Sequence, residues 1–258
     1  MLLRQHDPNP VSIMNEKSLS PFFMVCDHAG YAIPDQLKDL GLPEKDRYRH
    51  IAWDIGIKNV GEQLSILLGA TFITQTYSRL VIDCNRGENN LSLIAEKSDN
   101  SLIKGNQNLS SEQKHDRINE IYTPYHHTIS TLIDGRLATN IQTIFISLHS
   151  FTPVMNDGFQ RPWHAGILHG RNNQFSMIFK EILEENYHYP IGDNEPYALT
   201  EQNDYTVPTH AYQRNLPYLE LEIRQDLITS TDQQFEWAER LSLLLPMALK
   251  EYQTQCKL

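Results

Sequence analysis

The sequence has few cysteines and no paired cysteine motif. Its 258 residues include three cysteines, Cys26, Cys84 and Cys256, which lie far apart. An odd number of widely spaced cysteines argues against a disulfide framework and favours reduced thiols. The first ten residues, MLLRQHDPNP, contain no apolar segment long enough for a signal peptide. We therefore expect a cytoplasmic protein.

An excess of positive charge and long apolar runs are also lacking. The chain has 22 Lys and Arg against 32 Asp and Glu, which gives a formal charge of −10 at pH 7. Nucleic acids and anionic membranes bind to net basic surfaces, so neither is expected as a partner. No apolar run approaches the length of a membrane-spanning helix. A small anionic substrate is compatible with this charge, because a few arginines can form a local positive pocket.

The chain has no internal repeat and no linker rich in proline, glycine or serine. A length of 258 residues suits one large domain or two small ones. Because no boundary divides it, we expect a single domain over residues 1–258, with residues 1–20 as an irregular N-terminal segment.

Short apolar runs alternate with segments of helical periodicity. Strands are predicted at 21–26, 71–77, 79–83, 143–149, 165–170 and 216–224, and helices at 34–42, 54–69, 111–137 (kinked by Pro124), 174–187 and 232–252 (interrupted by Pro246). This alternation predicts an α/β sandwich with a mostly parallel or mixed sheet. The active site is expected beyond the carboxyl ends of the strands. The polar stretch 88–110 indicates a surface excursion or a lid.

Polar side chains follow four of the predicted strands. They are Asp27-His28, Asp83-Asn85-Arg86, His149-Ser150 and Glu220-Glu222-Arg224. In an open α/β sheet such strand ends converge on one crevice. Two imidazoles and a carboxylate are the ligands that zinc takes in catalytic hydrolase sites, with one position left for water. His28 and His149 are the natural imidazoles.

Glu222 and Arg86 are candidates for the remaining chemistry. A carboxylate such as Glu222 can hold or deprotonate a water without binding the metal. Arg86, in a tight Asn-Arg-Gly turn, presents a planar fork that can grip a substrate carboxylate. Each residue also has an ordinary structural explanation. Glu222 can pair with Arg224 on a solvated face, Asp54 can cap a helix, and Arg86 can brace its loop against Asp83.

Seven segments resemble the N-formylglutamate amidohydrolase family. In that family's order they are CDHAGYAIP, WDIGI, SRLVIDCNRG, IYTPYHH, LHSFTP, RPWHAGIL and LELEIRQDL, spanning about residues 22–228. More distantly, the chain is similar to zinc carboxypeptidases and to succinylglutamate and aspartoacyl deacylases. The resemblance implies a phosphorylase/hydrolase-like three-layer sandwich with a central mixed, mostly parallel sheet. It also implies an amidohydrolase acting on the linear amide bond of an N-formyl or other N-acyl amino acid, such as N-formylglutamate.

The resemblance also implies roles for individual residues. His28 and His149 would bind Zn²⁺, Asn85 and Arg86 would bind the substrate carboxylate, and Glu222 would be the catalytic base, with Arg86 orienting the substrate for reaction. The metal is zinc by analogy, and another divalent transition metal suits the same ligands.

Two positions depart from the pattern of the relatives. Tyr31 stands three residues after His28, where the carboxypeptidases carry a glutamate, so the carboxylate ligand must be Asp54 or Asp27. Asp54 is favoured, because a helix-start aspartate can face a strand-end site, whereas Asp27 adjoins His28 and tends to point the opposite way. Ser147 replaces the usual aspartate of the family, which predicts a weaker hydrogen bond to a metal ligand.

Arg79 and His126 complete the predicted substrate-binding set. Arg79 either extends the anion pocket or pairs with Asp83, and His126 lies near Pro124 and could face the pocket. Cys84 is not expected to be a nucleophile, because only Arg86 is near enough in sequence to activate a thiolate.

Two alternatives to an N-formyl amino-acid hydrolase stay open at this point. One is a non-catalytic protein that binds a carboxylate ligand on the same fold, for which Tyr31 and Ser147 are the evidence. The other is a hydrolase of a different N-acyl or peptide-like amide.

Overall fold

The computed structural model describes residues 1–155 and 157–256. Its strands are β1 (Val11–Met14), β2 (Phe22–Cys26), β3 (Thr71–Gln75), β4 (Lys97–Ser98), β5 (Ser101–Leu102), β6 (Ile144–Phe151), β7 (Ala165–Leu168), β8 (Ile191–Asp193) and β9 (Tyr218–Arg224). Its α-helices are α1 (Ile57–Leu68), α2 (Ser111–Arg117), α3 (Thr123–Ala138), α4 (Gln174–Asn186), α5 (Thr206–His210) and α6 (Thr231–Cys256). None of these helices combines the length and the apolarity needed to cross a membrane.

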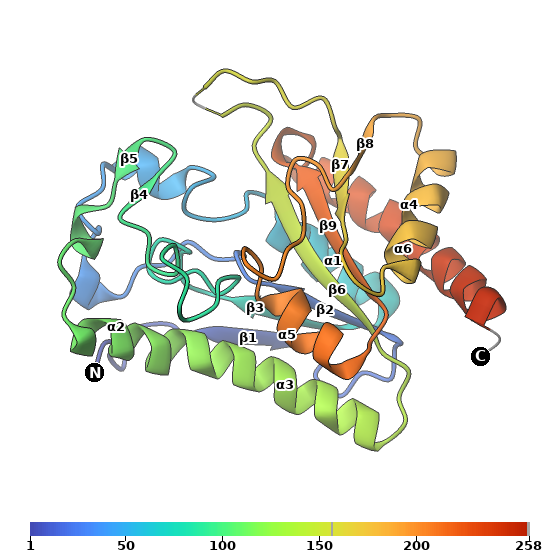
Figure 1. The fold of residues 1–258 in the computed structure, drawn as a ribbon, viewed down its shortest axis with the longest axis horizontal. Helices are drawn as coiled ribbons and strands as arrows, with labels where there is room; N and C mark the ends of the chain where they lie inside the picture. The colour runs from blue at the N-terminus through green and yellow to red at the C-terminus, as the bar shows by residue number, and fades with distance from the viewer. Residues whose placement is uncertain (156, 257–258) are drawn as a thin grey trace.

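A seven-stranded sheet forms the centre of the fold (Figure 1). Its strand order is β1-β3-β2-β6-β9-β7-β8. β1 is antiparallel to β3 and β7 is antiparallel to β9, whereas the other neighbouring pairs are parallel. β4 and β5 form a separate two-stranded sheet. The predicted α/β fold with a mixed, mostly parallel sheet is confirmed.

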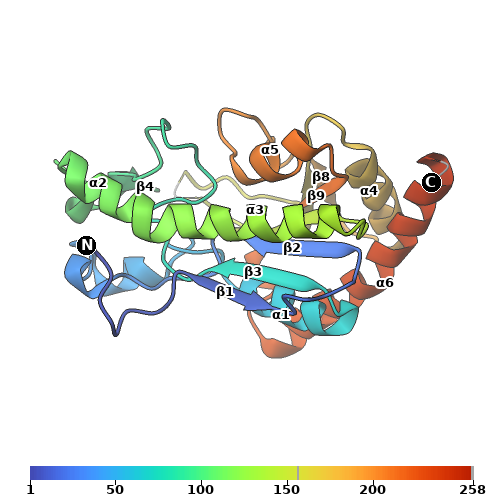
Figure 2. The same cartoon turned by 90° about the horizontal axis from the view of Figure 1, so that it is seen from below.

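Helices cover both faces of this sheet, which makes the molecule a three-layer sandwich. Figure 2 shows α3 along one side of the strands, with α1 and α6 on the other. Apolar side chains of α1, α4 and α6 pack with Met24, Ile146 and Leu221 from one face. Those of α3 and α5 pack with Phe23 and Phe145 from the opposite face. Because both faces are covered, β2 and β6 are buried at every position, as the apolar runs predicted.

The predicted strand at 79–83 is wrong. Residues 79–81 form a turn, in which the N–H of Val81 donates to Ser78, and the N–H of Asp83 donates to Leu93. Val81 and Ile82 are buried in the core beneath the surrounding loops, so their apolar character reflects burial without sheet pairing. A short apolar run alone does not distinguish these two cases.

Other predicted boundaries also differ. Residues 34–42 contain only a 3-10 turn at Asp35–Leu37, and β1 lies within the N-terminal segment expected to be irregular. Helix α1 begins after Gly56, whose φ of 83° and close approach to the Ile228 carbonyl favour glycine, so Asp54 precedes the helix without capping it.

The two prolines predicted to disturb helices have little effect on their continuity. Pro124 lies in the first turn of α3, directly after a π-helical turn at Ile118–Tyr122 that links α2 to α3. Pro246 lies inside α6, which continues through it. The polar stretch 88–110 contains β4 and β5 and contributes residues to the wall of a pocket.

Candidate active site

A pocket of about 430 Å³ opens where β2, β6 and β9 end. Parallel strands bring their carboxyl ends to the same edge, so side chains far apart in sequence meet there. All but one of the predicted site residues line it: His28, Asp54, Arg79, Asn85, Arg86, His149 and Glu222. His126 is the exception.

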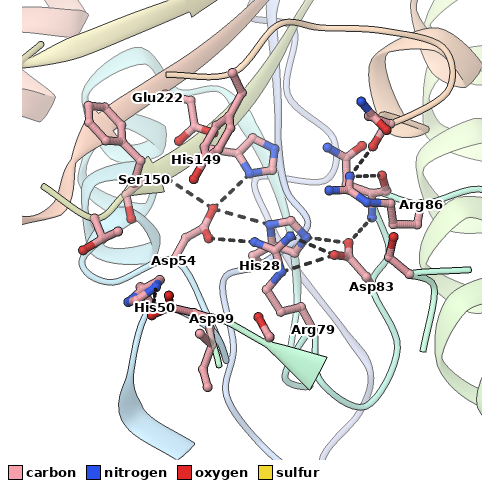
Figure 3. Close-up of a pocket in the computed structure, with 18 of the residues that line it drawn as sticks. His28, His50, Asp54, Arg79, Asp83, Arg86, Asp99, His149, Ser150 and Glu222 are labelled. Carbon is pink, nitrogen blue, oxygen red and sulfur yellow. Dashed lines mark hydrogen bonds and ion pairs between the residues drawn. The ribbon is translucent and has the colours of Figure 1, made fainter. Parts of the chain in front are cut away.

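His28, Asp54 and His149 form a compact buried group (Figure 3). His28 follows β2, His149 lies on β6, and Asp54 lies on the loop before α1. Oδ2 of Asp54 is 2.9 Å from Nδ1 of His149 and 3.5 Å from Nδ1 of His28. One ligand atom from each residue lies within 4.8 Å of the other two.

These three residues fit a divalent metal ion. Nδ1 of His28 is buried and has no hydrogen-bond partner in the described part of the chain, although it faces Asp54. Buried ring nitrogens are normally satisfied, so this atom indicates a ligand. Two imidazoles and a carboxylate are a donor set typical of zinc. The group could therefore hold a metal ion.

The ring nitrogens that face away from Asp54, Nε2 of both His28 and His149, contact other polar groups. Nε2 of His28 is at hydrogen-bond distance, 2.8 Å, from Oδ1 of Asp83. Nε2 of His149 is 3.1 Å from the Ser147 hydroxyl and 3.4 Å from Oδ2 of Asp27. Such contacts orient a metal-binding imidazole and set its tautomer. Asp27, the alternative carboxylate ligand, thus lies behind His149 on the side away from Asp54.

Asp54 is kept ionised by its surroundings. Burial raises the pKa of its carboxyl, but the neighbouring charge of His28 and the hydrogen bond from His149 outweigh burial and lower it. The N–H of Ser150 also donates to Oδ2 at 3.2 Å, and Arg79 lies 3.6 Å from Oδ1. An ionised carboxylate is the form that binds a metal.

Glu222 projects into the pocket beside His149 (Figure 3). Parallel pairing of β6 and β9 places the two residues opposite each other. Burial raises the pKa of Glu222 to about 7, although the charge of His149 opposes this. Arg224 binds Asp226 and not Glu222, so the predicted structural pair is not formed. A carboxyl group that titrates near neutrality is suited to general base catalysis.

Arg86 keeps one edge of its guanidinium available. Its Nη1 donates to the carbonyls of Asn85 and Asn203 and lies 4.0 Å from Asp204. Nε and Nη2 have no partner within residues 1–155 and 157–256. These two atoms form the edge that can bind a carboxylate through two parallel hydrogen bonds.

Asn85 uses its side chain to hold the loop before α5. Its Nδ2 donates to Asp204 at 3.2 Å, and its Oδ1 accepts from the backbone N–H groups of Tyr205 and Thr206, both at 3.0 Å. The side chain therefore positions this loop beside Arg86.

Arg79 and His126 are both engaged with protein groups. Nη2 and Nε of Arg79 bind Oδ2 of Asp83 at 2.8 and 3.2 Å. His126 lies behind the pocket wall, with its ring nitrogens 2.9 Å from the Cys84 carbonyl and 3.0 Å from His210. Burial raises the pKa of the Cys84 thiol well above its usual range, which disfavours a thiolate nucleophile.

Sequence reasoning assigned no role to Glu220 and did not single out Asp204, yet both line the pocket. The alternation of β9 places Glu220 on the face of Glu222 and could have identified it. Asp204 comes from a loop with no recognisable local signal.

A sequence profile of the N-formylglutamate amidohydrolase family matches residues 20–229. The chain belongs to this family. The chain is therefore a hydrolase with the fold of this family. Its membership argues against the alternative of a non-catalytic protein that binds a carboxylate ligand. Carboxylates stand near both departures: Asp54 lies beside the two imidazoles, and Asp27 lies behind His149.

Solved structures show the same fold as this N-formylglutamate amidohydrolase family member. The gene product Atu2144 from Agrobacterium tumefaciens is 30% identical, with a TM-score of 0.94 over 98% of this chain and 100% of that chain. An N-formylglutamate amidohydrolase from Ralstonia eutropha JMP134 is 18% identical, with a TM-score of 0.74 over 94% of this chain and 98% of that chain. A search of curated proteins found no significant match.

Proposed function

We propose that this chain hydrolyses the amide bond of an N-acyl amino acid, above all an N-formyl amino acid, with the help of a bound divalent metal ion. Family membership supports the reaction class, and N-formylglutamate is the substrate that the family name suggests. The observation that carries the proposal is the buried group of His28, Asp54 and His149, which faces Glu222 across one pocket.

His28, Asp54 and His149 would hold the ion, and zinc is the first candidate because of this ligand set. A bound zinc ion acts as a Lewis acid that lowers the pKa of water to about 7 and polarises an acyl oxygen. Asp83 and Asp27 keep the two imidazoles turned toward Asp54 by their contacts with the outer ring nitrogens.

Glu222 would move the proton in this reaction. As the base, it takes a proton from the attacking water and then delivers it to the nitrogen of the departing amine. Its pKa of about 7 suits both steps, because the carboxylate and the carboxylic acid are each populated near neutral pH.

Arg86 would orient the substrate. Its free Nε–Nη2 edge can bind the α-carboxylate of an N-acyl amino acid through two parallel hydrogen bonds. This contact would also neutralise the negative charge of the substrate. Holding the carboxylate places the amide near Glu222 and lowers the entropy lost in reaching the transition state. Arg79 instead secures Asp83 and Asp54.

The decisive experiment combines metal analysis with the Glu222→Gln substitution. We expect about one metal ion per chain in both proteins, and release of the free amino acid by the wild type that a chelator abolishes. Glu222→Gln should retain the ion and lose turnover by roughly 100-fold or more. Unchanged turnover in this variant would exclude Glu222 from the mechanism. Hydrolysis that persists without metal would exclude a catalytic role for an ion bound by His28, Asp54 and His149.

A further inference from the structure

Tyr197 brings a phenolic hydroxyl to the pocket from a segment with no recognisable motif. It lies on the loop that follows β8, within the sequence NEPYAL, and it lines the same pocket as Glu222 and Arg79. A tyrosine hydroxyl can both accept and donate a hydrogen bond. What it can do in the pocket therefore depends on which of these two capacities the protein itself uses.

The oxygen of this hydroxyl is held by Arg161. Nη1 of Arg161 donates to it at 2.9 Å and also donates to the carbonyl of Thr152 at 3.3 Å. Arg161 is only 9% exposed, and its guanidinium carbon lies 4.8 Å from the centre of the Tyr197 ring and 5.8 Å from that of Phe151. Such contacts between a cation and aromatic rings add to the hydrogen bonds. Together they fix the phenol at the wall of the pocket.

The proton of the hydroxyl remains available. Because the oxygen accepts from Arg161, the hydroxyl has one hydrogen of its own to donate, and no acceptor receives it in the described part of the chain. Burial raises the pKa of Tyr197, and the charge of Glu222 adds to this rise while Arg161 and Arg79 oppose it. The hydroxyl therefore stays protonated at neutral pH and can act as a donor.

The charges that act on Tyr197 also place it near the reacting part of the substrate. Glu222, the proposed base, is close enough to influence the hydroxyl, and both residues line one pocket. When water adds to an acyl carbon, the acyl oxygen gains negative charge. A donor that is already in position stabilises this charge without a cost of reorganisation. A fixed hydroxyl with a free proton beside Glu222 is suited to this task.

We propose that Tyr197 is a catalytic residue whose hydroxyl donates a hydrogen bond to the acyl oxygen of the substrate as that oxygen becomes negatively charged. The inference rests on the proposed function and deepens it. The oxygen of water forms a bond to the acyl carbon, the electron pair of the C=O π bond moves to the acyl oxygen, and Glu222 receives the proton of the water. When the C–N bond breaks, the C=O bond forms again and the same proton passes to the departing nitrogen. Tyr197 keeps its own proton throughout.

The experiment compares Tyr197→Phe with the wild type as metal-loaded proteins. The substrate is the N-formyl amino acid that the wild type hydrolyses fastest, with N-formylglutamate tried first. Phenylalanine keeps the ring that packs on Arg161 and removes only the hydroxyl. We expect kcat to fall about 100-fold while KM changes less than about threefold, because the lost hydrogen bond belongs to the transition state. Tyr189→Phe, at an exposed tyrosine stacked on His164, is the matched control and should keep the wild-type values.

The possible outcomes separate the inference from the proposed function. An unchanged kcat in Tyr197→Phe would overturn the inference and leave the proposed function intact. A rise in KM alone would also overturn it, because the hydroxyl would then bind the ground state and take no part in catalysis. A wild-type protein that hydrolyses no N-formyl amino acid would overturn the proposed function and this inference with it.

A second measurement does not depend on turnover. A phosphinate analogue, in which a P–H phosphinate group replaces the formyl group, has the tetrahedral shape and the negative charge of the reacting acyl group. We expect Tyr197→Phe to bind this analogue about tenfold or more weakly than the wild type, and to bind the free amino acid product with the wild-type affinity, in isothermal titration calorimetry. Unchanged affinity for the analogue, or equal weakening of both ligands, would overturn the catalytic assignment.

Discussion

Asp27 and His149 lie side by side at the ends of two neighbouring strands, with Oδ2 of Asp27 3.4 Å from Nε2 of His149. β2 pairs in parallel with β6, with Val25 opposite Ser147, so Asp27 and His149 each lie two residues beyond this pair. Ser147 contributes only a hydroxyl to the same nitrogen, at 3.1 Å. The carboxylate behind the imidazole therefore comes from the adjacent strand.

Replacing Asp27 by asparagine should weaken metal binding by about 10–100-fold, because the imidazole of His149 loses the charge that orients it and raises its basicity. The affinity is measured by titration against a competing chelator. Asp134→Asn, an exposed aspartate that pairs with Arg214, is the control and should bind metal as the wild type does. An unaltered metal affinity in Asp27→Asn would mean that the Ser147 hydroxyl is enough to orient the imidazole of His149.

Replacing Arg86 by lysine should raise KM by about tenfold or more and affect kcat less, because an ammonium cannot form the two parallel hydrogen bonds of a guanidinium edge. Steady-state kinetics with an N-formyl amino acid test this. Arg240→Lys on α6 provides a control of the same chemistry on the surface. A KM equal to that of the wild type would exclude Arg86 from binding the substrate carboxylate.

Gly30→Ala should lower the free energy of unfolding by about 2 kcal/mol or more, because the new methyl group would lie 1.9 Å from the carbonyl oxygen of Thr76. This clash falls in the loop that carries His28. Gly135→Ala on α3 is the matched control, since a methyl group there meets open space and alanine stabilises a helix interior by about 0.5–1 kcal/mol. Urea unfolding of both variants measures the two effects, and equal midpoints would contradict the steric argument.

The buried pair of His126 and His210 should make the protein less stable in acid. Burial lowers the pKa of His126 from 6.5 to about 4, and burial with the charge of His126 lowers that of His210. The unfolded chain therefore binds protons more readily than the folded one. The stabilisation is fully present above about pH 6.5 and is lost as the pH falls toward about 4, by about 3 kcal/mol for His126.

Urea unfolding between pH 7.5 and 4.5 measures this dependence. His126→Asn should show a smaller loss of stability over that range than the wild type, whereas His127→Asn, at an exposed neighbouring position, should retain the wild-type slope. Identical slopes in all three proteins would show that His126 does not contribute to acid unfolding.

Several features of the site were open to prediction because they depend on local pattern. The buried runs before His28 and His149 predicted strands that end at one edge of a sheet, and the structure brings both imidazoles to that edge. The alternation along 216–224 predicted one apolar face and one polar face, and Glu222 lies on the face that lines the pocket. Patterns of this kind follow from the two-residue period of a strand.

Other features were not open to prediction. The run 79–83 has the composition of a strand but is buried beneath loops, and residues 34–42 contain only a 3-10 turn. His126 was expected at the pocket and lies behind its wall against His210, a residue 84 positions away. In each case the outcome depends on which distant segment packs against the element.

The sequence by itself determined the family, the α/β class and the two imidazoles, because periodicity and motif order are properties of the chain. Only the tertiary structure grouped Asp54 with the two imidazoles and placed Asp27 on the opposite side of His149. It also placed Glu220, which has no hydrogen-bond or ion-pair partner in the described part of the chain, in a pocket rich in carboxylates. The physical reason is that side-chain direction, burial and the sum of nearby charges arise from contacts between segments, and no single stretch of sequence contains them.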